Sequence, residues 1–175
     1  MVEHLRDAAT AAAAFGLPAF LWLAWAVPHT TRRRQLGVVA LAGFAAATTV
    51  AGIALTIARW DEPTALTAPL VSVYLVVLAL HAAVVRVCAG FASKRGKADL
   101  VPTLVAVLGS PHFFVLGELL SFPALGLGAL AATVAGLLAG PAAKVVGTRG
   151  PATVGVVTGL AFLATSAGAL AAAAS

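Results

Sequence analysis

The chain has 175 residues, of which 61% are hydrophobic and 10% are charged, and its formal net charge at pH 7 is +5. Ordinary soluble chains carry about 25% charged residues, so this composition, with a mean hydropathy of +1.03, excludes a soluble domain. One cysteine, Cys88, excludes an intramolecular disulfide and a cysteine-based metal cage. The basic residues lie in short clusters between apolar tracts, which favours contact with anionic lipid and argues against nucleic acid as a partner.

Apolar tracts recur along the whole chain after a short N-terminal stretch of mixed charge, which is not typical of a secretory signal. A membrane span needs about 20 apolar residues. By this criterion the sequence predicts six spans in a single all-α transmembrane domain, at about residues 8–27, 36–58, 66–90, 100–120, 124–143 and 152–174. The predicted fold is therefore a polytopic integral membrane bundle of six helices.

Positive charge predicts how this bundle is oriented. The loops after the first, third and fifth spans share a side and hold eight of the eleven basic residues: Arg32, Arg33, Arg34, Lys94, Arg95, Lys97, Lys144 and Arg149. The opposite side receives Glu3, Asp7, Asp61 and Glu62, with Arg6 and Arg59. Because Lys and Arg are retained in cytoplasmic loops, we expect a multi-pass protein of the cell membrane with both termini outside.

The fourth span is interrupted at Gly109-Ser110-Pro111. Serine followed by proline suits an N-cap and a first helical position, since proline has no N–H to leave without a partner. We therefore expect a helix that is kinked or broken near Pro111 and closes with a turn at 121–123. Broken membrane helices often hold substrate or ion sites, although a simple proline kink packed against its neighbours fits the same residues.

Two histidines lie at similar depth on consecutive predicted spans. His81 is roughly 13 Å and His112 roughly 18 Å from the same boundary, at 1.5 Å per residue. Facing histidines suit a proton relay or bis-histidine ligation of a b-type haem, and we expect a ring separation of about 6–14 Å for these uses. The alternative is two unrelated histidines, each bonded to a neighbour.

Glu118 is the other ionisable residue between Leu100 and Ala143. It follows His112 by six residues and points close to the opposite side of the helix, so the two side chains are not expected to touch. If the side chain of Glu118 is enclosed by the bundle, it would serve as a protonatable gate. If it lies at the outer membrane boundary, it would reach the lipid headgroups. No pair of carboxylates, HExxH motif or phosphate-binding loop indicates a catalytic or metal site, which argues against an enzyme.

Close helix packing is indicated by two GxxxG pairs, Gly136–Gly140 and Gly155–Gly159. Such pairs let helix backbones approach one another. We expect them to pack within the bundle rather than to form a dimer.

Three functions remain open on the sequence alone. The first is movement of a proton, small ion or small solute through a site at the broken helix, involving Ser110, His112, Glu118 and His81. The second is a redox subunit in which His81 and His112 hold haem b within a larger respiratory assembly. The third is a structural subunit of a membrane complex, without a site or cofactor of its own.

Overall fold

The computed structural model describes residues 4–175, and its regular elements are all helical. These are α1 (Leu5–Ala26), α2 (Arg32–Ala58), α3 (Ala68–Lys94), α4 (Val101–Gly109), α5 (His112–Leu119), α6 (Pro123–Val146) and α7 (Gly150–Ala174), with 3-10 turns η1 (Val27–His29) and η2 (Ala98–Leu100). In this described part, six helical segments are long and apolar enough to cross a membrane, because η2, α4 and α5 together make the fourth. The predicted all-α bundle of six spans, with a break in the fourth, is confirmed.

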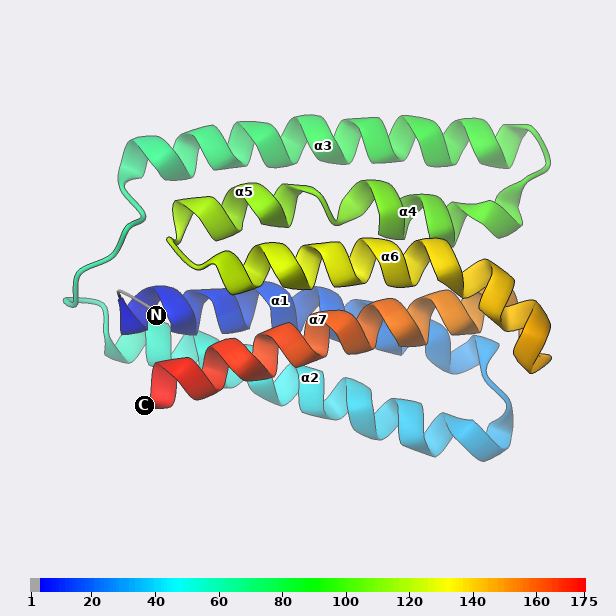
Figure 1. Cartoon of the computed structure of the whole chain (residues 1–175), viewed down its shortest axis with the longest axis horizontal. Helices are drawn as coiled ribbons and strands as arrows, with labels where there is room; N and C mark the ends of the chain where they lie inside the picture. Colours follow the sequence, from blue (N-terminus) through cyan, green and yellow to red (C-terminus); the bar gives the residue numbers. More distant parts are fainter. Residues whose placement is uncertain (1–3) are drawn as a thin grey trace.

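The helices run side by side in an elongated bundle, with both termini at the same end (Figure 1). Helix α1 packs along α2 and α7, and α6 packs on the other side of α7. Helices α4 and α5 pack against α6. The main contacts of α3 within the described residues are with α4, α5 and η2. Helices α2 and α3 therefore form opposite edges of the bundle, and the broken span lies between α3 and α6.

Small residues allow the closest helix contacts. A Cβ added to Gly155 would lie 2.8 Å from the Cβ of Ala26, and one added to Gly159 would lie 2.7 Å from the Cγ of Leu23. These contacts join α7 to α1 within one chain, which confirms the packing expected of this glycine pair. In α6, Gly136 packs on α4 in the same manner, whereas Gly140 has no neighbour within 4 Å of its added Cβ.

An aromatic core holds the restart of the broken span against the rest of the bundle. The ring of Phe113 in α5 lies 4.5 Å, centroid to centroid, from Phe15 in α1 and 5.1 Å from Phe162 in α7. Phe15 and Phe162 are themselves 5.8 Å apart. Aromatic pairs at these separations are favourable in addition to their burial, so this cluster fixes α5 relative to α1 and α7.

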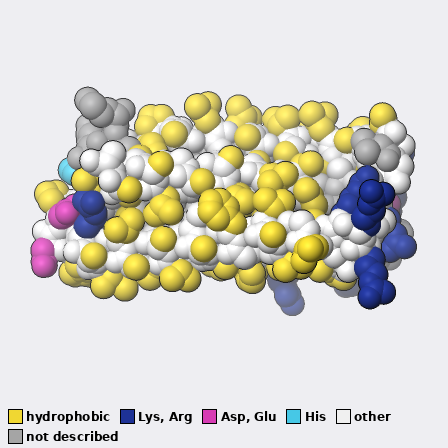
Figure 2. All heavy atoms as spheres, turned by 90° about the horizontal axis from the view of Figure 1, so that it is seen from below, with side chains coloured by type: hydrophobic (Ala, Val, Ile, Leu, Met, Phe, Trp, Pro, Cys, Tyr) yellow, Lys and Arg dark blue, Asp and Glu magenta, His cyan; other side chains and the backbone are white. Residues whose placement is uncertain are grey.

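Charge separates the two ends of the bundle. Lys and Arg side chains gather at one end of the face drawn in Figure 2, and the acidic side chains visible on that face lie at the other end. Helix α2 begins at Arg32, earlier than the residue 36 expected, so the arginine run forms its first turn. Long arginine side chains can extend from such a turn into the headgroup region. Glu3, assigned to the opposite end by the sequence, lies outside the described residues.

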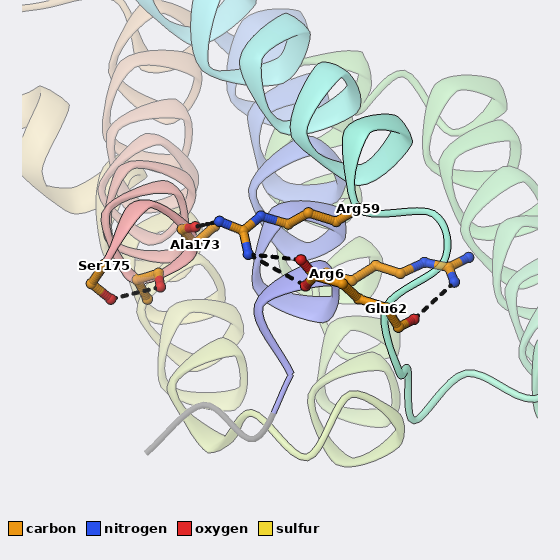
Figure 3. Close-up of polar contacts among 6 residues, drawn as sticks. Arg6, Arg59, Glu62, Ala173 and Ser175 are labelled. Atoms are coloured by element: carbon orange, nitrogen blue, oxygen red, sulfur yellow. Dashed lines mark hydrogen bonds and ion pairs between the residues drawn. The ribbon is translucent and has the colours of Figure 1, made fainter.

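Arginines at the end that carries both termini tie the α2–α3 loop to its neighbours (Figure 3). Arg6 donates to the carbonyls of Trp60 and Glu62, and its guanidinium lies 4.3 Å from the centre of the Trp60 ring. Arg59 forms a salt bridge of 3.3 Å with Glu62 and donates to the carbonyl of Ala173 at 3.1 Å. The loop is thereby fixed to α1 and to the last turn of α7.

Asp7 completes this end from inside the bundle. The sequence places it in a charged terminal stretch, but in the structure its residue is only 1% exposed. Its carboxylate accepts hydrogen bonds from the hydroxyl of Thr64 and from the N–H of Ala65, the latter at 2.8 Å. A buried carboxylate is tolerated when its oxygens accept such bonds, so Asp7 anchors the loop to α1.

Candidate functional site

The break in the fourth span is a loss of hydrogen bonds more than a change of backbone direction. Ser110 (φ −79°, ψ −30°) and Pro111 (φ −61°, ψ −27°) both keep helical dihedral angles. The N–H groups of Phe113 and Phe114 bond the carbonyls three residues earlier, as in a 3-10 helix. Proline offers no N–H to the carbonyl of Val107, four residues before it. The span is therefore interrupted without a long unwound segment.

Ser110 does not cap α5, and that part of the sequence interpretation was wrong. Its hydroxyl donates to the carbonyl of Ala106 at 2.7 Å, one turn back in α4, and α5 begins at His112 without a side-chain cap. Serine hydroxyls commonly bond the carbonyl four residues earlier in apolar surroundings. Ser110 is buried and lies at the break, but its single O–H donor is already used.

His81 binds the backbone at the break. Its Nε2 atom hydrogen-bonds the carbonyl of Leu108, whose usual helical donor would have been the N–H of His112. Freed carbonyls are tolerated at membrane depth when a neighbouring helix supplies a donor. Helix α3 thus contributes a side chain that satisfies the interruption in α4.

His112 lies directly beside His81. The ring centroids are 5.3 Å apart, slightly closer than the 6–14 Å expected from the sequence. On its other sides, His112 has Tyr74 at 6.3 Å and Phe113 at 4.0 Å, again between ring centroids. The buried Nδ1 atom of His112 has no hydrogen-bond partner of normal geometry among residues 4–175. Buried polar atoms are usually paired, and the backbone of Gly109 is the group nearest to pairing with this ring.

A cleft of about 520 Å³ is lined in part by His112. It lies between α1, α3 and the broken span, with mainly apolar walls and a few hydroxyl and imidazole groups. The residues that line it are Thr10, Ala14, Leu17, Pro18, Leu21, Trp22, Leu66, Val71, Tyr74, Leu78, Val105, Gly109, Ser110, His112, Phe113, Leu116 and Phe162. An apolar cavity with a few convergent polar groups is the usual form of a small-molecule site.

The lining residues show how far the cleft extends toward each end of the bundle. One end reaches Leu66 in the α2–α3 loop, at the end of the bundle that carries both termini. Along α1 the lining extends from Thr10 to Trp22, a rise of about 18 Å at 1.5 Å per residue. Toward the basic end, Trp22 packs against a buried cluster that contains Ala106 and Val154. The lining therefore extends from Leu66 near the terminal end toward the basic end as far as Trp22 in α1 and Val105 in α4.

Glu118 stands apart from this cleft. It is exposed, lies in the last turn of α5, and is not among the lining residues. The structure thus brings together His81, His112 and Ser110 but not Glu118. Tyr74, Thr10 and Trp22 line the cleft together with His112 and Ser110, whereas His81 is not among the lining residues.

The histidine pair does not have the geometry of a haem ligand set. Metal–imidazole bonds of about 2 Å place two ring centroids on opposite sides of a metal about 6 Å apart, whereas these centroids are 5.3 Å apart. The Nε2 atom of His81 is also directed at the Leu108 carbonyl. Among residues 4–175, no three His, Cys, Asp or Glu side chains are grouped as metal ligands.

The chemistry open to this site is hydrogen bonding and proton exchange. Imidazole changes its charge near neutral pH and can give or take a proton from either nitrogen. Among residues 4–175 no hydrogen bond joins the rings of His81 and His112, so with centroids 5.3 Å apart a proton would pass between them through a water molecule. The chain matches no protein-family model, no curated protein and no solved structure.

Proposed function

We propose that this multi-pass membrane protein moves a small, weakly ionisable solute across the bilayer through the site at the broken fourth span. The solute would enter the cleft at the end that carries both termini and exchange a proton with His112. It would then continue uncharged past the break. The observation that carries this proposal is the 520 Å³ cleft, whose lining includes His112, a residue with a buried nitrogen that has no partner among residues 4–175.

The apolar walls support a solute that crosses without charge. Transferring an isolated ion into apolar surroundings is far more costly than transferring a hydrogen-bonded neutral group. The cleft offers hydroxyl and imidazole groups from Thr10, Tyr74 and His112, and no carboxylate or ammonium group lines it. A weak acid or weak base reaches its neutral form by exchanging one proton, and His112 is the lining residue whose imidazole can both donate and accept one.

The histidine pair supports the proton step. A proton accepted by His112 has His81 as its neighbour, 5.3 Å away between ring centroids. His81 is held by the Leu108 carbonyl, so the backbone at the break and the ring that faces His112 are mechanically joined. A small change in the break would therefore alter the spacing of the two rings, and such changes are the usual way in which broken membrane helices gate a site.

We also propose an orientation for this activity. The three basic loops would face the cytoplasm, because Lys and Arg are retained on that side. The cleft would then open toward the outside, and the lipid bilayer would surround α2 and α3 at the two edges of the bundle. This orientation predicts uptake when the outer solute concentration is the higher one.

The proposal is tested by flux into liposomes that contain the purified protein and a trapped pH-sensitive dye. Acetate serves as the weak acid, methylammonium as the weak base, and a potassium gradient with valinomycin drives protons alone. We expect the wild-type protein to accelerate the change of internal pH under at least one of these gradients. His112→Phe should return the rate to that of protein-free liposomes, since phenylalanine keeps the ring but exchanges no proton.

His4→Phe is the matched control, because His4 precedes α1 and lies outside the cleft. It should leave the flux at the wild-type rate. If the wild-type protein and His112→Phe give the same rate under all three gradients, the proposed movement of solute or proton is wrong. The break would then be a packing kink in a structural protein.

A further inference from the structure

A second cavity, of about 850 Å³, lies at the basic end of the bundle. Its walls come from the α1–α2 turn, the first turns of α2, the α6–α7 loop and the start of α7. Helices α2 and α7 are both capable of spanning a membrane, and both begin at this cavity. It therefore lies at the boundary between the bilayer and water, at the opposite end from the cleft lined by His112.

Three arginines, Arg33, Arg34 and Arg149, line this second cavity. Among residues 4–175, none of the three side chains forms a salt bridge or a hydrogen bond with another residue. Arg33 and Arg34 lie in the first turn of α2, and Arg149 precedes α7 more than one hundred residues later. No carboxylate is among the lining residues. Three arginines converging on one space without an anion are a built site for an anionic group.

Uncharged donors lie around the same space. Thr31 precedes α2 and accepts at its carbonyl from the N–H groups of Arg34 and Gln35, but its side chain forms no cap hydrogen bond. The N–H groups of the first two helical residues have no partner within the helix. Thr30, Thr31, Thr148 and Thr153 all line the cavity. The hydroxyls of Thr30 and Thr153 donate to the carbonyls of Val27 and Arg149, which leaves the hydroxyls of Thr31 and Thr148 as the donors for a ligand. Guanidinium groups together with hydroxyl and backbone donors are typical of phosphate recognition.

The floor of the cavity is apolar. Val38, Val156 and Val157 line it below the arginines. Val38 follows Arg32 by six residues, which places it about 9 Å further along the helix axis. A free phosphate ion would use only the arginine-lined rim, whereas a phospholipid has a phosphate for the rim and a glycerol and acyl region for the floor.

We propose that this cavity binds a phosphate-bearing anion. An anionic phospholipid is the ligand that would contact both the arginine-lined rim and the apolar floor of the cavity. Basic pockets between membrane helices on the positively charged side are known to hold such headgroups. The lipid would join the α1–α2 turn to the α6–α7 loop. This cavity and the cleft lined by His112 share no lining residue, so lipid binding would be separate from solute binding.

The test is a calorimetric titration of the purified protein in neutral detergent. Short-chain phosphatidylglycerol, the zwitterionic phosphatidylcholine of equal chain length, and inorganic phosphate are the three ligands. The cavity variant is Arg33→Gln/Arg34→Gln/Arg149→Gln. Its matched control, Lys94→Gln/Arg95→Gln/Lys97→Gln, removes the same charge from the other basic loop at this end, whose residues do not line the cavity.

We expect phosphatidylglycerol to bind the wild-type protein more tightly than phosphatidylcholine does. The cavity variant should weaken phosphatidylglycerol binding by about tenfold or more, and the control by less than about twofold. Arg149→Gln alone provides the same comparison, with a smaller loss, if the triple variant does not fold.

Inorganic phosphate separates the two sources of the anion. Binding of phosphatidylglycerol with little competition from phosphate assigns the site to a lipid headgroup. Binding of inorganic phosphate with similar affinity assigns it to free phosphate compounds. If no ligand binds, the site is refuted. If the cavity and control variants lose equal affinity, attraction to the basic surface as a whole explains the binding, and the site is again refuted.

Discussion

Substituting a single glycine tests whether α1 and α2 pack as closely as the structure indicates. A Cβ added to Gly52 would lie 2.6 Å from the N atom of Ala13 and 2.8 Å from the carbonyl oxygen of Ala9. Favourable contacts of carbon atoms begin near 3.5 Å, so Gly52→Ala requires a shift of roughly 0.5–1 Å between two helix backbones. Overpacking of this kind costs about 1–3 kcal/mol.

Gly43 is the matched control in the same helix. A Cβ added there has no neighbour within 4 Å, so Gly43→Ala should gain up to about 1 kcal/mol from helix propensity. Unfolding of both variants and the wild-type protein would be followed in mixed micelles by circular dichroism as the fraction of denaturing detergent rises. We expect Gly52→Ala to unfold first and Gly43→Ala no earlier than the wild type. Equal midpoints for the two variants would refute the close α1–α2 packing.

Three further predictions address the break, the orientation and the cofactor. Pro111→Ala should restore the helical hydrogen bond to the fourth span, preserve the folded yield and abolish the flux; a change in stability with full flux would identify a packing kink instead. In a Cys88→Ala background, cysteines at Thr31, Ser93 and Thr148 should resist an impermeant thiol reagent added outside intact cells, and labelling at any of them would reverse the orientation. An absorption spectrum of the purified protein should lack a Soret band, because the histidine pair does not have the spacing of a haem ligand set; a stoichiometric Soret band would contradict this.

The architecture was predictable because the bilayer imposes simple rules of length and composition. Six apolar tracts, four of their five connections charged and the fifth broken by Pro123, require six helices. The interruption at Pro111 follows from the missing N–H of proline. The proximity of His81 and His112 followed from the fixed rise per residue of two antiparallel helices, and the observed separation of 5.3 Å is close to the expected range.

The remaining features depend on how the helices pack, which periodicity and composition do not determine. The hydroxyl of Ser110 could either cap α5 or bond a carbonyl of α4, and the sequence does not distinguish the two. In the structure it donates to the carbonyl of Ala106 in α4. The burial of Asp7 depends on a loop that folds back from 57 residues later in the chain. The cleft exists because α1 and α3 are not packed directly together along the broken span, and no pattern in either helix indicates that separation.

The central claim is that His112 is reached from the end of the bundle that carries both termini. It is tested most directly by His112→Cys in a Cys88→Ala background, reconstituted in one known orientation and treated from either side with a small water-soluble thiol reagent. Phe114→Cys is the control, because this neighbouring α5 side chain is 40% exposed on the surface of the bundle and does not line the cleft. The structure predicts that the cysteine at position 112 reacts from the terminal side and not from the basic side, while the cysteine at 114 reacts from neither. Equal protection of both cysteines from both sides, or reaction at 112 from the basic side, would contradict the account.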